Sequence, residues 1–317
     1  MVKPDAGAPP QPGAGPQAVK ASEGTGKASE RTGRDQPGRP GSPGGTDAFG
    51  PTGPIAPEIV NPGGAGPLLL VCEHASNVIP ARYANLGISA DVADSHAAWD
   101  PGACSVARAV SRRLDAPLIA AAVSRLVYDC NRPPEAPGAM PEKSEVFEIP
   151  GNAGLSEDRK RARVAEVYEP FRQGLAGLIA ATGAAGGHPK VLVTVHSFTP
   201  VYFGKARAVQ IGILHDSDSL MADAMLAIAG DFTDLDVQRN QPYGPEHGVT
   251  HTLIEHGLRN GIPNVMIEIR NDLLTSEDQQ QAMAAMLAAW IGAACERISL
   301  SAVPVPAIGV QTTGKGS

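Results

Sequence analysis

Short, wholly apolar runs alternate with longer segments of helical character, and this alternation constrains the fold more than any other feature. The clearest runs lie at residues 67–72, 190–195 and 264–269. A run of this kind, rich in Leu, Val and Ile and bounded by polar turns, predicts a strand buried on both faces. Strands that alternate with helices predict a single three-layer α/β/α domain around a mostly parallel, mixed sheet.

The remaining elements follow the same logic. Asp100-Pro101 predicts an N-cap and a first helical position, and Ser156 predicts a second cap. Residues 131–153 are rich in Pro and Gly, and a loop of that length is usually functional or disordered. Further strands are expected at residues 118–123, 126–130 and 209–214, and helices at 100–114, 156–181, 219–229, 249–260 and 276–298.

Composition divides the chain into a folded segment and two tails. Residues 1–62 are dominated by Pro, Gly, Ala, Ser and Lys. Such a segment cannot bury enough apolar surface to offset its ordering entropy, so we expect a disordered tail. Residues 301–317 look the same, which leaves residues 63–300 as one domain with a sizeable core.

Charge and cysteine usage limit the partners and the compartment. The net charge of −7 and the scattered basic residues argue against a nucleic-acid partner. No apolar run approaches the ~20 residues that span a bilayer, so no membrane partner is expected. The cysteines lie far apart and form no CxxC pair, which is typical of buried thiols in a reducing compartment. We therefore expect a cytoplasmic protein; its cysteines are Cys72, Cys104, Cys130 and Cys295.

Polar side chains that can do chemistry stand at the ends of several predicted strands. In open α/β sheets, ligands bind outside the carboxyl ends of the strands, so these side chains are expected to share one rim. They are His74; Asp129 with Asn131 and Arg132; His196; and Glu268 with Arg270.

Two histidines on different strands predict a catalytic zinc site. His74 and His196, completed by a third ligand, would leave one coordination position of Zn²⁺ open for water. Glu268 is the candidate general base for that water. A lone strand-end histidine is more often structural, but two of them with a strand-end glutamate favour the metal.

Basic and amide side chains nearby suit a small carboxylate substrate. Asn131 and Arg132 offer donors for a substrate carboxylate, although Arg132 has Asp129 and Glu135 as alternative partners. Arg125 is a candidate for stabilising an oxyanion. Arg270 is a further candidate substrate contact, with a surface ion pair to Asp272 as its alternative role.

The motifs together resemble one enzyme family. CEHASNVIP, HAAWDPGA, SRLVYDCNRPP, VHSF and VMIEIRNDLL occur in this order between residues 67 and 295. Their order and spacing are similar to the N-formylglutamate amidohydrolase family, and NR and HS followed by a late EIR also resemble the zinc carboxypeptidases. The resemblance implies a phosphorylase/hydrolase-like α/β fold, zinc on His74 and His196, substrate carboxylate on Asn131 and Arg132, Arg125 near the oxyanion, and Glu268 as the base.

One position departs from the carboxypeptidase pattern. That pattern places an acid three residues after the first histidine, where this chain has Asn77. The third ligand must come from elsewhere, and His96 is our first choice, with Asp100 as the alternative. Residues 245–256 match neither HExxH nor HxxEH, so His247 or His251 is expected only as a substrate contact.

Three functions remain open from the sequence. The first is zinc-dependent hydrolysis of a small N-formyl or N-acyl amino acid. The second is a metal-dependent carboxypeptidase or cell-wall peptide amidase, and whether residues 131–153 cover the pocket distinguishes the two. The third is a non-catalytic binding protein, which the missing acid at Asn77 keeps open. No GxSxG, P-loop or GxGxxG motif supports a nucleophilic or nucleotide enzyme.

Overall fold

The computed structural model describes residues 53–184 and 191–301. Most of the expected N-terminal tail and nearly all of the C-terminal one lie outside these ranges. The expected boundary at residue 62 is wrong, because β1 (Glu58–Val60) pairs antiparallel with β3 (Leu118–Ala120). The sheet therefore begins inside the segment that composition assigned to the tail.

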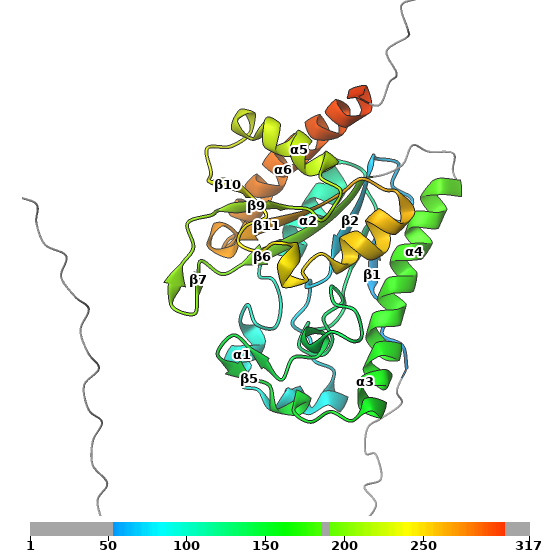
Figure 1. Ribbon diagram of the computed structural model, residues 1–317, viewed down its shortest axis with the longest axis vertical. Helices are drawn as coiled ribbons and strands as arrows, with labels where there is room; N and C mark the ends of the chain where they lie inside the picture. The colour runs from blue at the N-terminus through cyan, green and yellow to red at the C-terminus, as the bar shows by residue number, and fades with distance from the viewer. Residues whose placement is uncertain (1–52, 185–190, 302–317) are drawn as a thin grey trace, which may run out of the picture. The chain divides into compact units, whose positions relative to one another are not determined.

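The expected three-layer α/β/α fold with a mostly parallel sheet is confirmed (Figure 1). Parallel pairs join β3 to β2, β2 to β6, β6 to β11 and β9 to β10, whereas β11 and β9 pair antiparallel. Within the described residues, the sheet runs in the order β1, β3, β2 (Leu68–Cys72), β6 (Val191–Phe198), β11 (Asn264–Arg270), β9 (Ile211–Leu214) and β10 (Val237–Arg239).

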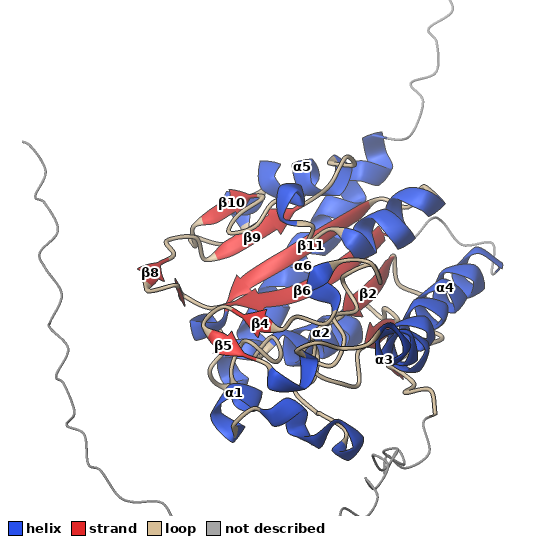
Figure 2. Ribbon diagram, turned by 60° about the horizontal axis from the view of Figure 1, so that its bottom comes forward, coloured by secondary structure: helices blue, strands red, loops and turns tan. Residues whose placement is uncertain are grey.

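Helices cover the sheet because each central strand is apolar on both faces (Figure 2). Leu68 and Leu70 pack with α2, α5 and α6, whereas Leu69 and Val71 face a second core that includes α4. The helices are α1 (Ala90–Asp94), α2 (Ala103–Arg113), α3 (Glu157–Arg163), α4 (Glu169–Ala184), α5 (Leu220–Ala227) and α6 (Glu277–Ser301).

The long C-terminal helix α6 is a core element. By length and composition alone, Glu277–Ser299 could cross a membrane. In the fold, however, Leu287, Trp290 and Ile291 are fully buried, and the Trp290 indole donates to the Met225 carbonyl of α5. Packing against α2 and α5 explains its apolar face without a bilayer.

Two sequence expectations on the loop side of the fold need correction. Residues 126–130 form turns, not a strand, because the Ser124 carbonyl accepts from the amides of Val127 and Tyr128. The loop 131–153 contains short structure, including the hairpin of β4 (Lys143–Ser144) and β5 (Phe147–Glu148). The expected helix after Ser156 is present as α3 and α4, joined by the π-helix η4 (Val164–Tyr168), and Ser156 caps it.

Candidate active site

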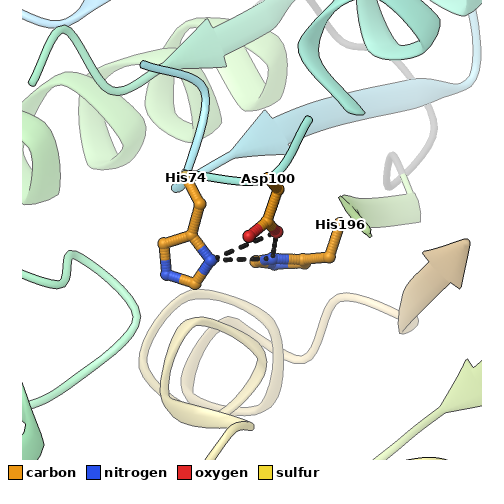
Figure 3. Close-up of side chains that lie close together, drawn as sticks. All are labelled: His74, Asp100 and His196. Atoms are coloured by element: carbon orange, nitrogen blue, oxygen red, sulfur yellow. Dashed lines mark hydrogen bonds and ion pairs between the residues drawn. The ribbon is translucent and has the colours of Figure 1, made fainter. Parts of the chain in front are cut away.

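Three buried side chains point at one another at the rim of the sheet: His74, Asp100 and His196 (Figure 3). The two Nδ1 atoms lie 3.1 Å apart, and Asp100 Oδ2 lies 3.3 Å from His74 Nδ1 and 2.9 Å from His196 Nδ1. Four-coordinate zinc with bonds of ~2.0–2.2 Å separates its ligand atoms by about 3.4 Å. The triangle therefore has nearly the dimensions of one face of a zinc site.

Neighbouring strands bring these residues together. His74 lies two residues after the end of β2, and His196 lies near the end of β6. These strands are parallel, so both ends reach the same rim. Asp100 is expected to cap α2, but the N-cap is Gly102, in the left-handed conformation (φ 82°). The Asp100 amide donates to the His74 carbonyl (3.0 Å), and its carboxylate accepts from the Ser197 amide (3.2 Å). Asp100 thus belongs to the site rather than to the helix end.

A buried carboxylate faces the outer nitrogen of each imidazole. His74 Nε2 lies 2.8 Å from Asp129 Oδ1, and His196 Nε2 lies 3.1 Å from Glu73 Oε2, at an angle poor for a hydrogen bond. Carboxylates accept protons, so both Nε2 atoms carry the hydrogen when the rings are neutral. The two Nδ1 lone pairs then face Asp100, which is the arrangement of metal-ligating histidines held by outer carboxylates.

The site favours a cation. Burial and Arg125 oppose charge on His74, yet Asp129 and Asp100 outweigh them and raise its pKa. Burial likewise opposes charge on His196, and Glu73 and Asp100 raise its pKa well above the ordinary value. Two imidazolium rings would direct N–H groups at each other across 3.1 Å, whereas one ion among three lone pairs removes that conflict. The donor set of two imidazoles and one carboxylate fits zinc.

Glu268 lies beside this group. It pairs in register with His196 on the adjacent parallel strand, and it is 6% exposed. Among the described residues, its Oε2 has no hydrogen-bond partner. Burial raises the pKa of Glu268 to about 7, which suits a group that accepts and releases a proton near neutrality.

Arg125 closes the other side of the site. Its guanidinium lies 2.6 Å from Asp129 Oδ2 and 3.5 Å from Asp100 Oδ1. Burial alone would raise the pKa of Asp129, but Arg125 and His74 hold it well below its usual range. Arg125 thus keeps the carboxylate behind His74 ionised and also lines the cavity.

These groups, apart from Glu73, line a cavity of about 440 Å³, a size suited to a small molecule. Asn131 and Arg132 line it as well. The Asn131 amide is occupied, since Nδ2 donates to the Val249 carbonyl (2.6 Å) and Oδ1 accepts from the Thr252 amide (3.0 Å). Arg132 Nη1 donates to the carbonyls of His247 and Gly248, which fixes the guanidinium at the cavity wall.

His96, our first choice for the third ligand, is not part of the triangle, and Asp100 takes that place. His96 Nε2 lies 2.7 Å from Glu145 Oε2, and both residues line the cavity away from the three ligand atoms. Asp100, the alternative ligand expected from the sequence, is the residue that reaches both histidines. The hydrogen bond from the Asp100 amide to the His74 carbonyl places Asp100, rather than His96, beside the histidines.

Two other expected substrate contacts lie off the cavity. His251 accepts or donates a hydrogen bond with the Tyr168 hydroxyl (2.8 Å), and His247, the alternative, lines the cavity instead. Arg270 pairs with Asp272 (2.8 Å) and donates to the Arg207 and Ala208 carbonyls (3.1 Å each).

Three residues of the site were not expected from the sequence. Glu73 had a local signal, since an acid inside a buried strand end requires a partner. No local sequence pattern indicated Glu145 or Arg207, because each meets its neighbours only through the hairpins beside the cavity.

Comparisons with known proteins identify the family and support the fold. The chain matches the family N-formylglutamate amidohydrolase over residues 66–275. It is 54% identical to the crystal structure of gene product Atu2144 from Agrobacterium tumefaciens, with a TM-score of 0.75, covering 78% of this chain and 97% of that one. N-formylglutamate amidohydrolase from Ralstonia eutropha JMP134 shares the fold, at 19% identity and a TM-score of 0.55, covering 78% and 98%. Among proteins of curated function, none matches.

Fold and site together define an α/β/α hydrolase with its polar site at the carboxyl ends of parallel strands. The match covers about two thirds of the chain and includes every site residue described above, whereas β1 and α6 lie outside it. The chain belongs to the N-formylglutamate amidohydrolase family, a family of amidohydrolases.

Proposed function

We propose that this protein is a zinc-dependent enzyme that hydrolyses the amide bond of a small N-formyl amino acid such as N-formylglutamate. The observation that carries the proposal is the triangle of His74 Nδ1, His196 Nδ1 and Asp100 Oδ2 beside the unpartnered Glu268 oxygen. Family membership supports the class of reaction.

The three triangle residues would hold the ion. Zinc supplies Lewis-acid chemistry when bound, because it polarises an amide carbonyl and lowers the pKa of a water molecule. Asp129 and Glu73 hold the imidazoles so that both Nδ1 lone pairs face the same point.

Glu268 and Arg125 act on the reacting groups. Glu268 takes a proton from the attacking water and delivers it to the nitrogen that leaves as the free amine. Arg125 donates hydrogen bonds toward the carbonyl oxygen as negative charge develops there. The products are formate and the free amino acid.

The partly covered cavity favours a small substrate over a peptide. Glu145, from the loop 131–153, accepts from the Phe203 amide (2.8 Å) while its other oxygen meets His96. This carboxylate links the β4–β5 hairpin to the hairpin of β7 (Val201–Tyr202) and β8 (Lys205–Ala206). Arg132, fixed at the wall, is placed to take the α-carboxylate of the substrate.

Release of formate from N-formyl-L-glutamate by the purified protein tests the proposal. We expect about one equivalent of zinc per chain, loss of turnover when a chelator removes it, and recovery when zinc returns. A panel of dipeptides serves as the comparison, and we expect much slower cleavage of them.

A different experimental outcome would contradict each part of the proposal. Full turnover after complete removal of metal would remove zinc from the reaction. Faster cleavage of dipeptides than of formylglutamate would favour the carboxypeptidase alternative. A metal-free protein that cleaves neither substrate would favour the binding protein.

A further inference from the structure

Arg207 lies in a cage of aromatic rings on the cavity wall. Its guanidinium carbon lies 4.4 Å from the centroid of Tyr202, 4.8 Å from that of Tyr243 and 5.6 Å from that of Phe198. All four residues line the cavity that holds the histidines. Stacking of a guanidinium on aromatic faces is favourable and fixes its plane, so the five N–H donors have a defined direction.

Among the residues that the structure describes, no carboxylate pairs with the charge of Arg207. None of the ion pairs within 4.0 Å in residues 53–184 and 191–301 includes it, unlike Arg125 and Arg270. The Arg207 side chain donates from Nη1 to the Thr199 carbonyl, at 3.3 Å, and its charge also acts on the Tyr243 hydroxyl. An arginine held rigidly in a cavity, with donors to spare and no counter-charge, is suited to an anionic ligand.

Two hydrogen bonds fix the backbone of Arg207. Its amide donates to the Pro200 carbonyl (2.8 Å), and its carbonyl accepts from Arg270 Nη1 (3.1 Å). Asp272 in turn fixes Arg270, with Nε to Oδ1 at 2.8 Å. Arg270, expected to contact substrate, instead positions the residue that lines the cavity.

Tyr243 connects Arg207 to the reacting end of the cavity. Burial raises the pKa of Tyr243 to about 12, and the Glu268 carboxylate adds to the shift. The same ring therefore stacks with Arg207 and lies within electrostatic range of Glu268. A small molecule of amino-acid size can reach from one to the other across a cavity of about 440 Å³.

We propose that Arg207 is the residue that binds the second, side-chain carboxylate of the substrate and thereby distinguishes an acidic side chain from a neutral one. This inference rests on the proposed function, with Arg132 taking the α-carboxylate. The carboxylate at Arg207 is not transformed. It forms two parallel N–H···O bonds with the guanidinium fork, which a neutral side chain cannot match.

A substrate pair that differs only in this charge tests the proposal. N-formyl-L-glutamate and N-formyl-L-glutamine have the same shape, but the second carries an amide at the side-chain end. The variant Arg207→Met removes the charge and leaves an unbranched apolar chain among the rings. Lys205→Met is the matched control, because it removes a positive charge from an exposed residue of the same hairpin that does not line the cavity.

We expect Arg207→Met to lower kcat/KM for formylglutamate by about 10- to 150-fold, the range for a lost charge-assisted hydrogen bond, chiefly through KM. For formylglutamine the change should stay within about threefold. Lys205→Met should leave both substrates within about threefold of the parent protein. Arg207→Lys should fall between the parent and Arg207→Met, because it keeps the charge and loses the planar fork.

Equal losses for both substrates, or no loss for formylglutamate, would overturn the assignment. Glutarate binding, followed by calorimetric titration, separates this inference from the proposed function. If the parent protein hydrolyses neither formyl compound but binds glutarate, and Arg207→Met does not, the reaction is wrong and the carboxylate site stands. If neither protein binds glutarate, the carboxylate site is wrong as well.

Discussion

His74 Nδ1 and His196 Nδ1 lie 3.1 Å apart although 122 positions separate them in the chain. The two imidazoles meet edge to face, at 67° between the ring planes, with each outer nitrogen turned to a buried carboxylate. Two ring nitrogens at this separation share a cation or compete for a proton. The carboxylate of Asp100 is the third group that meets them there.

Asp100, and not His96, should be required for the metal. Asp100→Asn keeps the shape of the side chain and removes its charge, so we expect zinc affinity to fall at least as far as the ~10- to 100-fold that loss of an outer-shell partner costs. His96→Asn should keep the parent stoichiometry, because His96 pairs with Glu145 instead. Elemental analysis of both variants, with circular dichroism to confirm folding, measures this; metal loss in His96→Asn alone would reverse the assignment.

Glu268→Gln should separate chemistry from metal binding. The amide has the same size as the carboxylate but cannot accept the proton, so we expect kcat to fall by ~10²- to 10⁴-fold. Bound zinc should be retained, since Glu268 is not one of the three ligand residues. Steady-state kinetics and metal content are the two readouts, and parent-like turnover would exclude Glu268 as the base.

Asp129→Asn should lower the affinity of the site for zinc, although Asp129 is not one of the three ligand residues. Asp129 holds His74 Nε2 at 2.8 Å and neutralises Arg125, so its loss should cost ~10- to 100-fold in zinc affinity. Competition with a chelator measures the affinity. Asp158→Asn is the control, because Asp158 is 87% exposed on α3 and pairs only with a neighbour one turn away. An unchanged affinity in Asp129→Asn would contradict the role given to this carboxylate.

Removal of Glu145 should loosen the cover of the cavity. Glu145→Ala deletes the bonds to His96 and to the Phe203 amide, and we expect KM for formylglutamate to rise about tenfold, as for loss of one charge-assisted bond. Cleavage of a formylated dipeptide should improve relative to formylglutamate. Glu148→Ala is the control, since Glu148 is 68% exposed on the same hairpin and meets only Lys143. Unchanged selectivity would show that the hairpin does not limit substrate size.

His256 should make the fold less stable in mild acid. Burial lowers its pKa to about 4, against ~6.5 in an unfolded chain, so the unfolded state binds more protons between these values. Stability is fully present above about pH 7 and should fall by about 2 kcal/mol between pH 7 and pH 5 through this group. Urea unfolding of the parent and of His256→Phe at both pH values isolates it. An equal pH dependence in the two proteins would assign the acid sensitivity to other groups.

The strands most accurately expected from the sequence are the buried ones. Leu68–Cys72 is apolar throughout, and Asn264–Arg270 contains the apolar run of residues 265–267; such runs fit a central strand between two helical layers. The segment 126–130 has similar composition but follows Ser124, whose hydroxyl and carbonyl bind the next backbone amides and close a turn. Local hydrogen bonding of this kind competes with strand pairing and leaves no periodic signal.

The sequence by itself determined the layered α/β/α fold and the rim at which His74, His196 and Glu268 meet. These follow from hydrophobic periodicity and from the rule that parallel strands bring their carboxyl ends to one edge. Only the tertiary structure decided that Asp100 joins the histidines while His96 turns to Glu145, and that Arg207 lies among three aromatic rings. These contacts join loops far apart in the chain, and their partners are chosen by burial and charge in three dimensions rather than by spacing.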